Sequence, residues 1–371
     1  MLPLVPLIHP RQRLIGLVNG HDRPLREDGE LLVGDDRSDL DDRVRVGLET
    51  RHLEIDPNQI LCARHTVSVA TFDARVIAAF GRHLLVQEAS GRTIRARPFG
   101  RDLGAVCGDE VRCRNDPRHD EVHVVEVLPR RTTLYRSNAR GGIEPVLANV
   151  TRLLVVIAPL PPPDPFVADR YLAAAESAGI AATPVLNKAE LGLDEALRRQ
   201  LEVYAAAGYP CITLSAATGE GIDLLLSACA GQVAALVGQS GVGKSSLVRR
   251  LAPDAEVEIG GLMREEEGRH TTTVSRLFEL AGGGRLIDSP GVRDFAPAVD
   301  HLDPRHLGFV EVGRLAPGCR FLDCRHMREP GCAVREAVES GAMDARRYES
   351  YRRLRRLAEE LSGIRRSKQR R

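Results

Sequence analysis

The sequence has few aromatic residues and no long apolar run. Tryptophan is absent, aromatic residues make up 4% of the chain, and no apolar stretch approaches the roughly twenty residues that cross a bilayer. The first residues, MLPLVPLIHPRQR, are apolar but contain three prolines and follow no basic region, so they do not resemble a signal peptide. The sequence therefore predicts a cytoplasmic protein that does not associate with membranes.

An excess of charge is also lacking, because the formal net charge is +1. The bulk composition therefore gives no sign of a polyanionic partner. Basic residues gather at the end of the chain, where residues 346–371 hold eleven Arg or Lys and three Glu. This segment, expected to be helical, suits contact with nucleic-acid phosphates or exposure to solvent as a charged helix, and the sequence leaves both open.

Five of the eight cysteines are scattered, and three lie near one histidine within fourteen residues. Three thiolates and one imidazole suit tetrahedral Zn²⁺, and four protein ligands leave no open position for catalysis. Buried thiols are the alternative, but this segment is rich in Arg, Asp, Glu and Pro. We predict one structural zinc ion in a small, mainly helical domain at 301–371. The predicted ligands are Cys319, Cys324, His326 and Cys332.

A length of 371 residues predicts two or three domains. Residues 1–72 are expected to form a partly ordered extension. Short β-rich runs between turn signals at 73–130 predict a small barrel of the OB-fold type, whose open face often binds RNA. Its arginines fit an RNA-binding face and a solvated strand surface equally well. They are Arg75, Arg82, Arg92, Arg95, Arg97, Arg101, Arg112 and Arg114.

Residues 131–300 are predicted to form an α/β domain. Arg130–Asn138 is interpreted as a linker. The apolar run Val150–Pro162, ended by prolines, is typical of a strand buried on both faces. Helix and strand patterns then alternate, which predicts a parallel sheet with helices on both sides.

The segment GQSGVGKSS fits the phosphate-loop pattern G-x-x-x-x-G-K-[ST]. A strand pattern precedes it and a helix pattern follows. The glycines let backbone N–H groups turn toward phosphate oxygens. Lys244 would reach the β- and γ-phosphates, and the Ser245 hydroxyl would hold Mg²⁺. The predicted nucleotide-binding residues here are Gly238, Gln239, Ser240, Gly241, Val242, Gly243, Lys244, Ser245 and Ser246.

Two earlier loops favour guanine as the base. Asn187 and Lys188 fit the N-K-x-D motif, whose carboxylate accepts two guanine protons that adenine does not offer. Here the carboxylate is Glu190, one methylene longer, so the strength of guanine selection stays open. A loop after the next strand would place a backbone N–H near guanine O6. The predicted base-loop residues are Asn187, Lys188, Ala189, Glu190, Ser215, Ala216 and Ala217.

Two later loops complete the set. Asp288 and Gly291 fit the D-x-x-G motif that supports Mg²⁺ and senses the γ-phosphate. Thr271 or Thr272 is the predicted switch I ligand of Mg²⁺. A valine stands where many GTPases have the glutamine that orients water, so His270 is the best substitute, with an ordinary surface histidine as the alternative. The predicted catalytic residues are His270, Lys244, Asp288 and Gly291.

The order of the loops is unusual, because both base loops precede the phosphate loop. All five loops can still meet at one edge of a doubly wound sheet, since that edge depends on the spatial order of the strands. The sequence therefore predicts a circularly permuted GTPase domain.

This order, together with GQSGVGKSSL, GRHTTT and DSPGVRDF, closely resembles the RsgA (YjeQ) family, over roughly residues 73–360. The resemblance implies an OB-fold, a permuted GTPase domain and a C-terminal zinc domain with the four ligands named above. It also implies slow GTP hydrolysis that the small ribosomal subunit stimulates late in its assembly. The implied partners are that subunit, its rRNA and other assembly factors. Nothing in the sequence demands more than a monomer.

Two other functions fit parts of the sequence. A general P-loop NTPase or small-molecule kinase would use the same phosphate loop, but no substrate-binding lid is recognisable. An RNA-binding protein with a weakened guanine site is suggested by Glu190. The intact Lys244, Ser245 and Asp288 argue against it.

Overall fold

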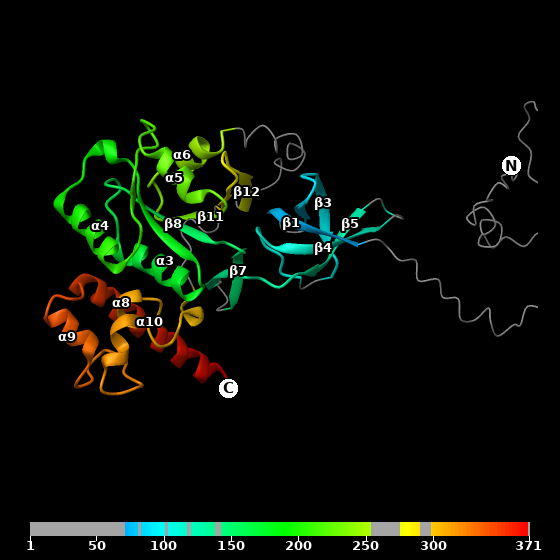
Figure 1. Cartoon of the computed structure of the whole chain (residues 1–371). Helices are drawn as coiled ribbons and strands as arrows, with labels where there is room; N and C mark the ends of the chain where they lie inside the picture. Colours follow the sequence, from blue (N-terminus) through cyan, green and yellow to red (C-terminus); the bar gives the residue numbers. More distant parts are fainter. Residues whose placement is uncertain are drawn as a thin grey trace, which may run out of the picture. The chain divides into compact units, whose positions relative to one another are not determined.

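The computed structural model describes residues 71–369, with gaps at 81–82, 101–102, 117–118, 120, 138–141, 254–274 and 290–297. A small β-barrel, an α/β unit and a set of C-terminal helices follow one another along the chain (Figure 1). Within this described part, no helix combines the length and the apolar character that crossing a membrane requires.

The barrel consists of five strands. β1 pairs antiparallel with β2 and β4, and β3 pairs parallel with β5, so the order β1-β2-β3-β5-β4 closes on itself. A closed five-stranded barrel of this kind confirms the predicted OB-fold. The strands are β1 (Thr71–Phe80), β2 (His83–Glu88), β3 (Thr93–Pro98), β4 (Glu110–Asp116) and β5 (Glu121–Val127).

Strand β4 shows why these residues form a barrel. Val111 and Cys113 are buried, and Arg112 between them lies on the outer side. Successive side chains of a strand point to opposite faces, so one apolar set fills the interior. The core residues of the barrel are Ala74, Val76, Leu84, Val86, Ala96, Val111, Cys113 and Val124.

Several arginines on the barrel already have partners. The guanidinium carbon of Arg114 lies 4.7 Å from the ring centroid of Phe99. Arg82 and Arg101 lie outside the described residues. Ion pairs with carboxylates of the barrel strands are formed by Arg75, Arg97 and Arg112. The paired arginines favour the interpretation of a solvated strand face at their positions, because their charge is partly neutralised within the barrel.

The prediction of a linker at Arg130–Asn138 is wrong. Most of the segment forms β6 (Thr133–Ser137), which pairs antiparallel with β7 (Ile143–Ala148). Leu134 lies opposite Leu147, and both are buried. The neighbours of Leu134, Thr133 and Tyr135, are half-buried, and a half-buried strand resembles a loop when only its composition is considered.

The α/β unit contains strands in the order β10-β9-β8-β11-β13-β12. The first five are parallel to one another, and β12 is antiparallel to β13. β12 also pairs with the end of β1, which joins the barrel to this sheet by hydrogen bonds. The strands are β8 (Arg152–Ile157), β9 (Ala181–Leu186), β10 (Ile212–Thr213), β11 (Val233–Val237), β12 (Ser275–Glu279) and β13 (Arg285–Asp288).

Helices cover both faces of this sheet, as predicted. Leu153 and Val155 of β8 pack in the core that contains α3 and α4, whereas Leu154 and Val156 pack in the core that contains α5 and α6. The continuous apolar run of β8 therefore packs against helices on both faces of the sheet. The helices are α3 (Pro165–Ser177), α4 (Glu195–Ala207), α5 (Ile222–Cys229) and α6 (Lys244–Leu251), with the 3₁₀ turn η2 (Ala189–Leu191) before α4.

The C-terminal part is mainly helical, as predicted. α10 packs against α3, and its buried Tyr351 and Leu354 belong to the core that includes α3. The elements are η4 (Val299–His301), α8 (Val310–Leu315), η5 (Ala316–Gly318), α9 (Ala333–Glu339) and α10 (Ala345–Gln369).

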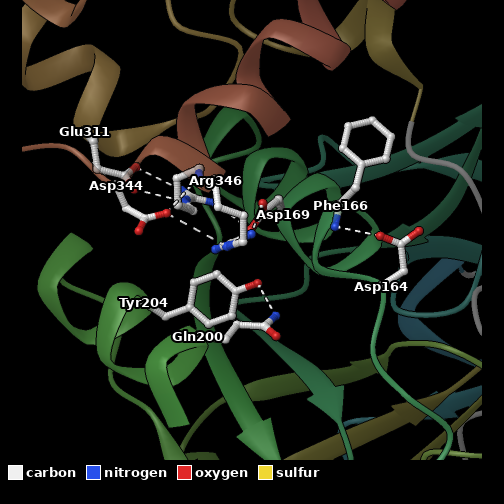
Figure 2. Close-up of polar contacts among 9 residues, drawn as sticks. Asp164, Phe166, Asp169, Gln200, Tyr204, Glu311, Asp344 and Arg346 are labelled. Atoms are coloured by element: carbon white, nitrogen blue, oxygen red, sulfur yellow. Dashed lines mark hydrogen bonds and ion pairs between the residues drawn. The ribbon is translucent and has the colours of Figure 1, made fainter. Parts of the chain in front are cut away.

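A buried ion-pair cluster joins α10 to α3 and α8 (Figure 2). Arg347 is 1% exposed and donates to Asp169 Oδ1 at 2.9 Å and to both oxygens of Glu311 at 2.8 Å. Arg346 donates to the other oxygen of Asp169 at 2.7 Å. Because each buried carboxylate has a guanidinium partner, the cluster holds the C-terminal helices on the face of the sheet that α3 covers.

Candidate nucleotide site and metal centre

The predicted nucleotide loops that the structure describes follow the carboxyl ends of parallel strands. These ends lie at one edge of the sheet, and β11 lies near its centre, between β8 and β13. Nucleotides bind at such an edge in doubly wound folds. The first residues of these loops are Asn187 after β9, Ser215 after β10 and Gly238 after β11, and Asp288 is the last residue of β13.

Two glycines of the phosphate loop occupy positions that only glycine fits. Gly238 has a φ of +139°, and a Cβ there would overlap the carbonyl of Val156 on β8. Gly243 has a φ of +96°, and a Cβ there would overlap the side-chain amide of Asn187. The backbone of the loop can therefore approach both the strand and the first base loop, as a phosphate cradle requires.

Lys244 is the first residue of α6 and is 5% exposed. Its Nζ donates to the carbonyl oxygens of Gly238 and Gln239, both at 2.5 Å. These bonds hold the ammonium over the loop at the N-terminal end of the helix, where phosphate oxygens bind. Ser245 follows in the first turn of α6, at the same end.

Asn187 connects the phosphate loop to the second base loop. Its buried side chain donates from Nδ2 to the Val242 carbonyl and accepts at Oδ1 from the Ala216 N–H, both at 2.9 Å. The sequence predicted only a contact with the base. The structure adds that this side chain fixes two loops relative to each other.

Lys188 lies across the phosphate loop. It has a φ of +62°, which is uncommon for a residue with a side chain. Its Nζ donates to the carbonyl oxygens of Leu160 at 2.8 Å and Gly241 at 2.7 Å. Glu190 follows in η2 and is exposed, so its carboxylate is accessible to a ligand from solvent.

The second base loop is held by a residue that sequence reasoning missed. Within the loop, Ser215 Oγ accepts from the Thr218 N–H at 3.0 Å. Arg250, in the last turn of α6, donates from Nε to the Ala216 carbonyl and from Nη2 to the Ala217 carbonyl, both at 2.9 Å. A basic residue at the end of a short helix carries no motif, so only the fold shows this contact.

The described part of the switch region is the end of β13. Asp288 ends this strand, and the buried Ser289 follows it. The Ser289 hydroxyl lies 2.5 Å from that of Ser275, the first residue of β12. The remaining predicted switch residues lie outside the described residues, so their roles stay predictions: His270, Thr271, Thr272 and Gly291.

The predicted metal ligands lie together in the C-terminal part. One ligand atom from each of four side chains lies within 4.8 Å of the others. His326 Nδ1 is 3.4 Å from Cys319 Sγ and 3.5 Å from Cys332 Sγ. Separations of this size suit a tetrahedron around Zn²⁺, with Zn–S bonds of about 2.3 Å. The four residues are Cys319, Cys324, His326 and Cys332.

The chemistry of these four donors fits zinc. Burial lowers the pKa of His326, so its imidazole is neutral and offers a lone pair. Burial raises the pKa of Cys324 to about 12, so a thiolate there needs a cation beside it. Zn²⁺ would supply that charge to a closed set of protein ligands.

Neighbouring groups shape the loop that carries His326. The Glu329 carboxylate accepts from the N–H groups of Met327 and Arg328, both at 2.9 Å. Burial alone would raise the pKa of Glu329, but hydrogen bonds from the backbone outweigh it and lower this pKa to about 2. Tyr348 of α10 donates to the His326 carbonyl at 2.7 Å. The long helix therefore helps to position the cluster.

Comparisons with known proteins establish the family. A sequence model described as RsgA GTPase matches residues 127–297. A relative from Ectopseudomonas mendocina (strain ymp), named small ribosomal subunit biogenesis GTPase RsgA, is 44% identical over 286 residues, which are 75% of this chain and 83% of the relative. The chain belongs to the RsgA GTPase family. A relative of the same name from Pseudomonas aeruginosa (strain LESB58) is 44% identical over 283 residues, with the same shares of the two chains.

Solved structures agree with membership of the RsgA family. The crystal structure of YjeQ from Thermotoga maritima matches with a TM-score of 0.61 and 29% identity, over 79% of this chain and 99% of that one. A structure described as YloQ, a circularly permuted GTPase, has the same fold, with a TM-score of 0.59 and 23% identity over 81% and 99% of the two chains. The family predicted from the motifs is confirmed, and this RsgA-family chain is a circularly permuted GTP-hydrolysing enzyme.

Proposed function

We propose that this RsgA-family enzyme assists late maturation of the small ribosomal subunit, binding the subunit and its rRNA. The relatives' shared name, small ribosomal subunit biogenesis GTPase RsgA, supports this role. The observation that carries it is the combination, in one chain, of a closed five-stranded barrel, a permuted loop order and a cluster of three cysteines and one histidine. We expect it to act as a monomer in the cytoplasm, with other assembly factors as further partners.

The phosphate loop is proposed to surround the phosphates of GTP. Lys244 neutralises the β- and γ-phosphate oxygens, and the Ser245 hydroxyl and Thr271 or Thr272 hold Mg²⁺. When bound, Mg²⁺ would supply positive charge that offsets the negative charge developing on the phosphates during transfer. Asp288 supports the metal from the end of β13. The position of Lys244 over the loop supports this assignment.

Guanine is proposed to be read by the two base loops. Asn187 and Lys188 hold the first loop against the phosphate loop, and the exposed Glu190 accepts the N1 and N2 protons. A backbone N–H of the second loop donates to O6. Adenine offers neither the donor pair nor the acceptor, so the site should prefer GTP to ATP.

Hydrolysis is proposed to depend on His270, which orients the attacking water. Gly291 of the D-x-x-G motif is expected to sense the γ-phosphate. A valine follows that glycine in place of a glutamine, so the enzyme alone should be slow. We expect the small subunit to accelerate hydrolysis by positioning His270.

The C-terminal part is proposed to contact rRNA through α10, around one structural Zn²⁺. Arg346 and Arg347 form ion pairs with carboxylates of α3 and α8, so their charge is already compensated within the protein. Arg353 and Arg356 are exposed and lie one turn or more further along the helix. Contacts with rRNA phosphates are therefore expected from the later arginines of the helix.

Co-sedimentation with purified ribosomal subunits tests the proposed partner. The protein bound to a non-hydrolysable GTP analogue should pellet with small subunits and not with large ones, and GDP should weaken this binding. Lys244→Ala should remove the difference between the nucleotides. Equal pelleting with both subunits, or with neither, would contradict the proposed role.

A further inference from the structure

Arg250 connects the helix of the phosphate loop to the loop proposed to read the base. It lies in the last turn of α6, the helix that begins with Lys244. One planar guanidinium donates to two successive carbonyls, those of Ala216 and Ala217, both at 2.9 Å. A guanidinium presents its N–H groups in a fixed fork, so this contact sets the orientation of two peptide planes together.

The contact of Arg250 with the two carbonyls, here called the Arg250 clamp, also fixes the direction of the neighbouring N–H groups, because the peptides are trans. C=O and N–H point in opposite directions across each peptide plane. With the carbonyls of Ala216 and Ala217 directed toward Arg250, the N–H groups of the following residues are directed away from it. The second of these, the Thr218 N–H, indeed donates inward to Ser215 Oγ at 3.0 Å.

The first of these, the N–H of Ala217, lies between two N–H groups that are already used. Ala216 donates to Asn187 Oδ1 at 2.9 Å, and Thr218 donates to Ser215. Among the residues that the structure describes, no acceptor bonds to the Ala217 N–H, and Ala217 is exposed. This leaves one donor of the loop available for a ligand.

We propose that Arg250 is a positioning residue for guanine recognition, which it serves by directing the Ala217 N–H toward the O6 atom of the base. This inference rests on the proposed function, because it takes Ser215–Ala217 to be a base loop. Glu190 carries its carboxylate on a longer side chain than the usual aspartate. We therefore expect selectivity for guanine to depend more on the O6 contact, and so on Arg250, than it would with an aspartate. The O6 contact is therefore a main source of selectivity for guanine over adenine.

The neighbouring Arg249 provides a matched control. It lies on the same helical turn and is exposed, and among the described residues its Nη2 bonds to Ser246 Oγ alone, at 3.4 Å, within its own helix. Arg249→Met and Arg250→Met remove the same charge from the same turn. Only the second change releases the two carbonyls.

Binding of three nucleotides tests the proposal by isothermal titration calorimetry. GDP and IDP both carry O6, IDP lacks the 2-amino group, and ADP lacks O6. Arg250→Met should weaken GDP and IDP by the same factor, about tenfold for the loss of one hydrogen bond, and leave ADP unchanged. The preference for GDP over ADP should shrink, while the ratio of GDP to IDP stays constant. Arg250→Lys, which keeps one donor, should be intermediate, and Arg249→Met should match the wild type.

Other results would contradict the proposal in distinguishable ways. A parallel loss of GDP, IDP and ADP affinity would show that Arg250 supports the phosphate site or the fold and does not position a base contact. Unchanged affinities in Arg250→Met and Arg250→Lys would show that the clamp is not needed. A wild-type protein that binds ADP as tightly as GDP would refute the proposed guanine site itself, before any variant is considered.

Discussion

Single side chains in the nucleotide site serve more than one loop. Asn187 bonds to the phosphate loop through Val242 and to the second base loop through Ala216, while Lys188 bonds to Gly241. The cost of losing such a residue therefore includes the buried partners that remain unsatisfied. Base recognition and phosphate binding should respond together to a change at Asn187.

Replacing Asn187 by alanine should weaken GDP binding by about 5- to 150-fold, because buried groups that lose their partner cost about 1–3 kcal/mol. The Val242 carbonyl and the Ala216 N–H would both lose their bonds to the side chain. Titration calorimetry measures the change. The exposed Asn115 on the barrel offers a control, and Asn115→Ala should bind GDP as the wild type does. If Asn187→Ala bound GDP as tightly as the wild type does, the inference that Asn187 links the phosphate loop to the second base loop would be wrong.

At the scale of single residues, local sequence patterns predicted those residues whose role depends on their spacing along the chain. The glycines and lysine of the phosphate loop lie at one strand end, and four donors spaced over fourteen residues lie together. Arg250 was missed because its contact joins residues 33 and 34 positions apart. No spacing in the sequence indicates a bond that arises only when two loops meet at a sheet edge.

At the scale of elements, the attachment of α10 to α3 depends on the buried Arg347. Replacing it with methionine would leave Asp169 and Glu311 buried with less compensation, and such a loss costs about 3–5 kcal/mol. Urea unfolding followed by circular dichroism should show this loss. On the same helix, Arg356 pairs with Glu349 at 3.7 Å, and both are about half exposed. Arg356→Met should therefore change stability by less than about 1 kcal/mol, and an equal effect of the two changes would contradict the buried-cluster account.

The same cluster predicts a response to acid. Burial alone would raise the pKa of Glu311, but its hydrogen bonds and ion pair with Arg347 outweigh this and hold the pKa below its ordinary value of 4.5. A depressed carboxyl pKa adds stability that is present above that ordinary value and is lost as the pH falls through the folded-state pKa. Glu311→Gln should therefore flatten the decline of unfolding free energy below about pH 4.5. An unchanged acid profile would show that Glu311 contributes nothing there.

Removal of the proposed zinc ion should unfold the segment around Cys324 and His326. The thiolates need a cation, because burial raises the pKa of Cys324 to about 12. Cys324→Ser should lower the zinc content of the purified protein and increase cleavage of this segment in limited proteolysis. Cys211 lies outside the cluster, with its Sγ near the Leu201 carbonyl, so Cys211→Ser should retain the metal. Equal zinc content in the two variants would argue against the assigned ligands.

Elements with strong periodicity were predictable, and those defined by distant pairing were not. The apolar run of β8 and the helix patterns after it predicted the parallel sheet, because burial on two faces leaves a continuous signal. β6 was missed, since its polar outer side resembles a loop. The pairing of β1 with β12 joins residues almost 200 positions apart, such as Ala78 and Arg276. Local composition does not encode such a contact.

At the scale of the whole molecule, the spatial order of strands preserves a nucleotide site that the chain order rearranges. β11 carries the phosphate loop near the centre of the sheet, and the base loops follow β9 and β10 on one side of it. Moving the start of the chain changes the connections between strands and leaves this edge intact. The motifs were therefore sufficient to predict the permutation. The succession of barrel, α/β unit and C-terminal helices was predicted from changes in the residue pattern along the sequence.

We propose that this permuted site hydrolyses GTP faster when the small ribosomal subunit is bound. The most direct test is the rate of phosphate release from GTP and from ATP, each with and without purified small subunits. We predict slow, GTP-selective turnover that rises sharply when small subunits are added. Equal turnover of ATP, or a GTP rate that small subunits do not change, would contradict the account.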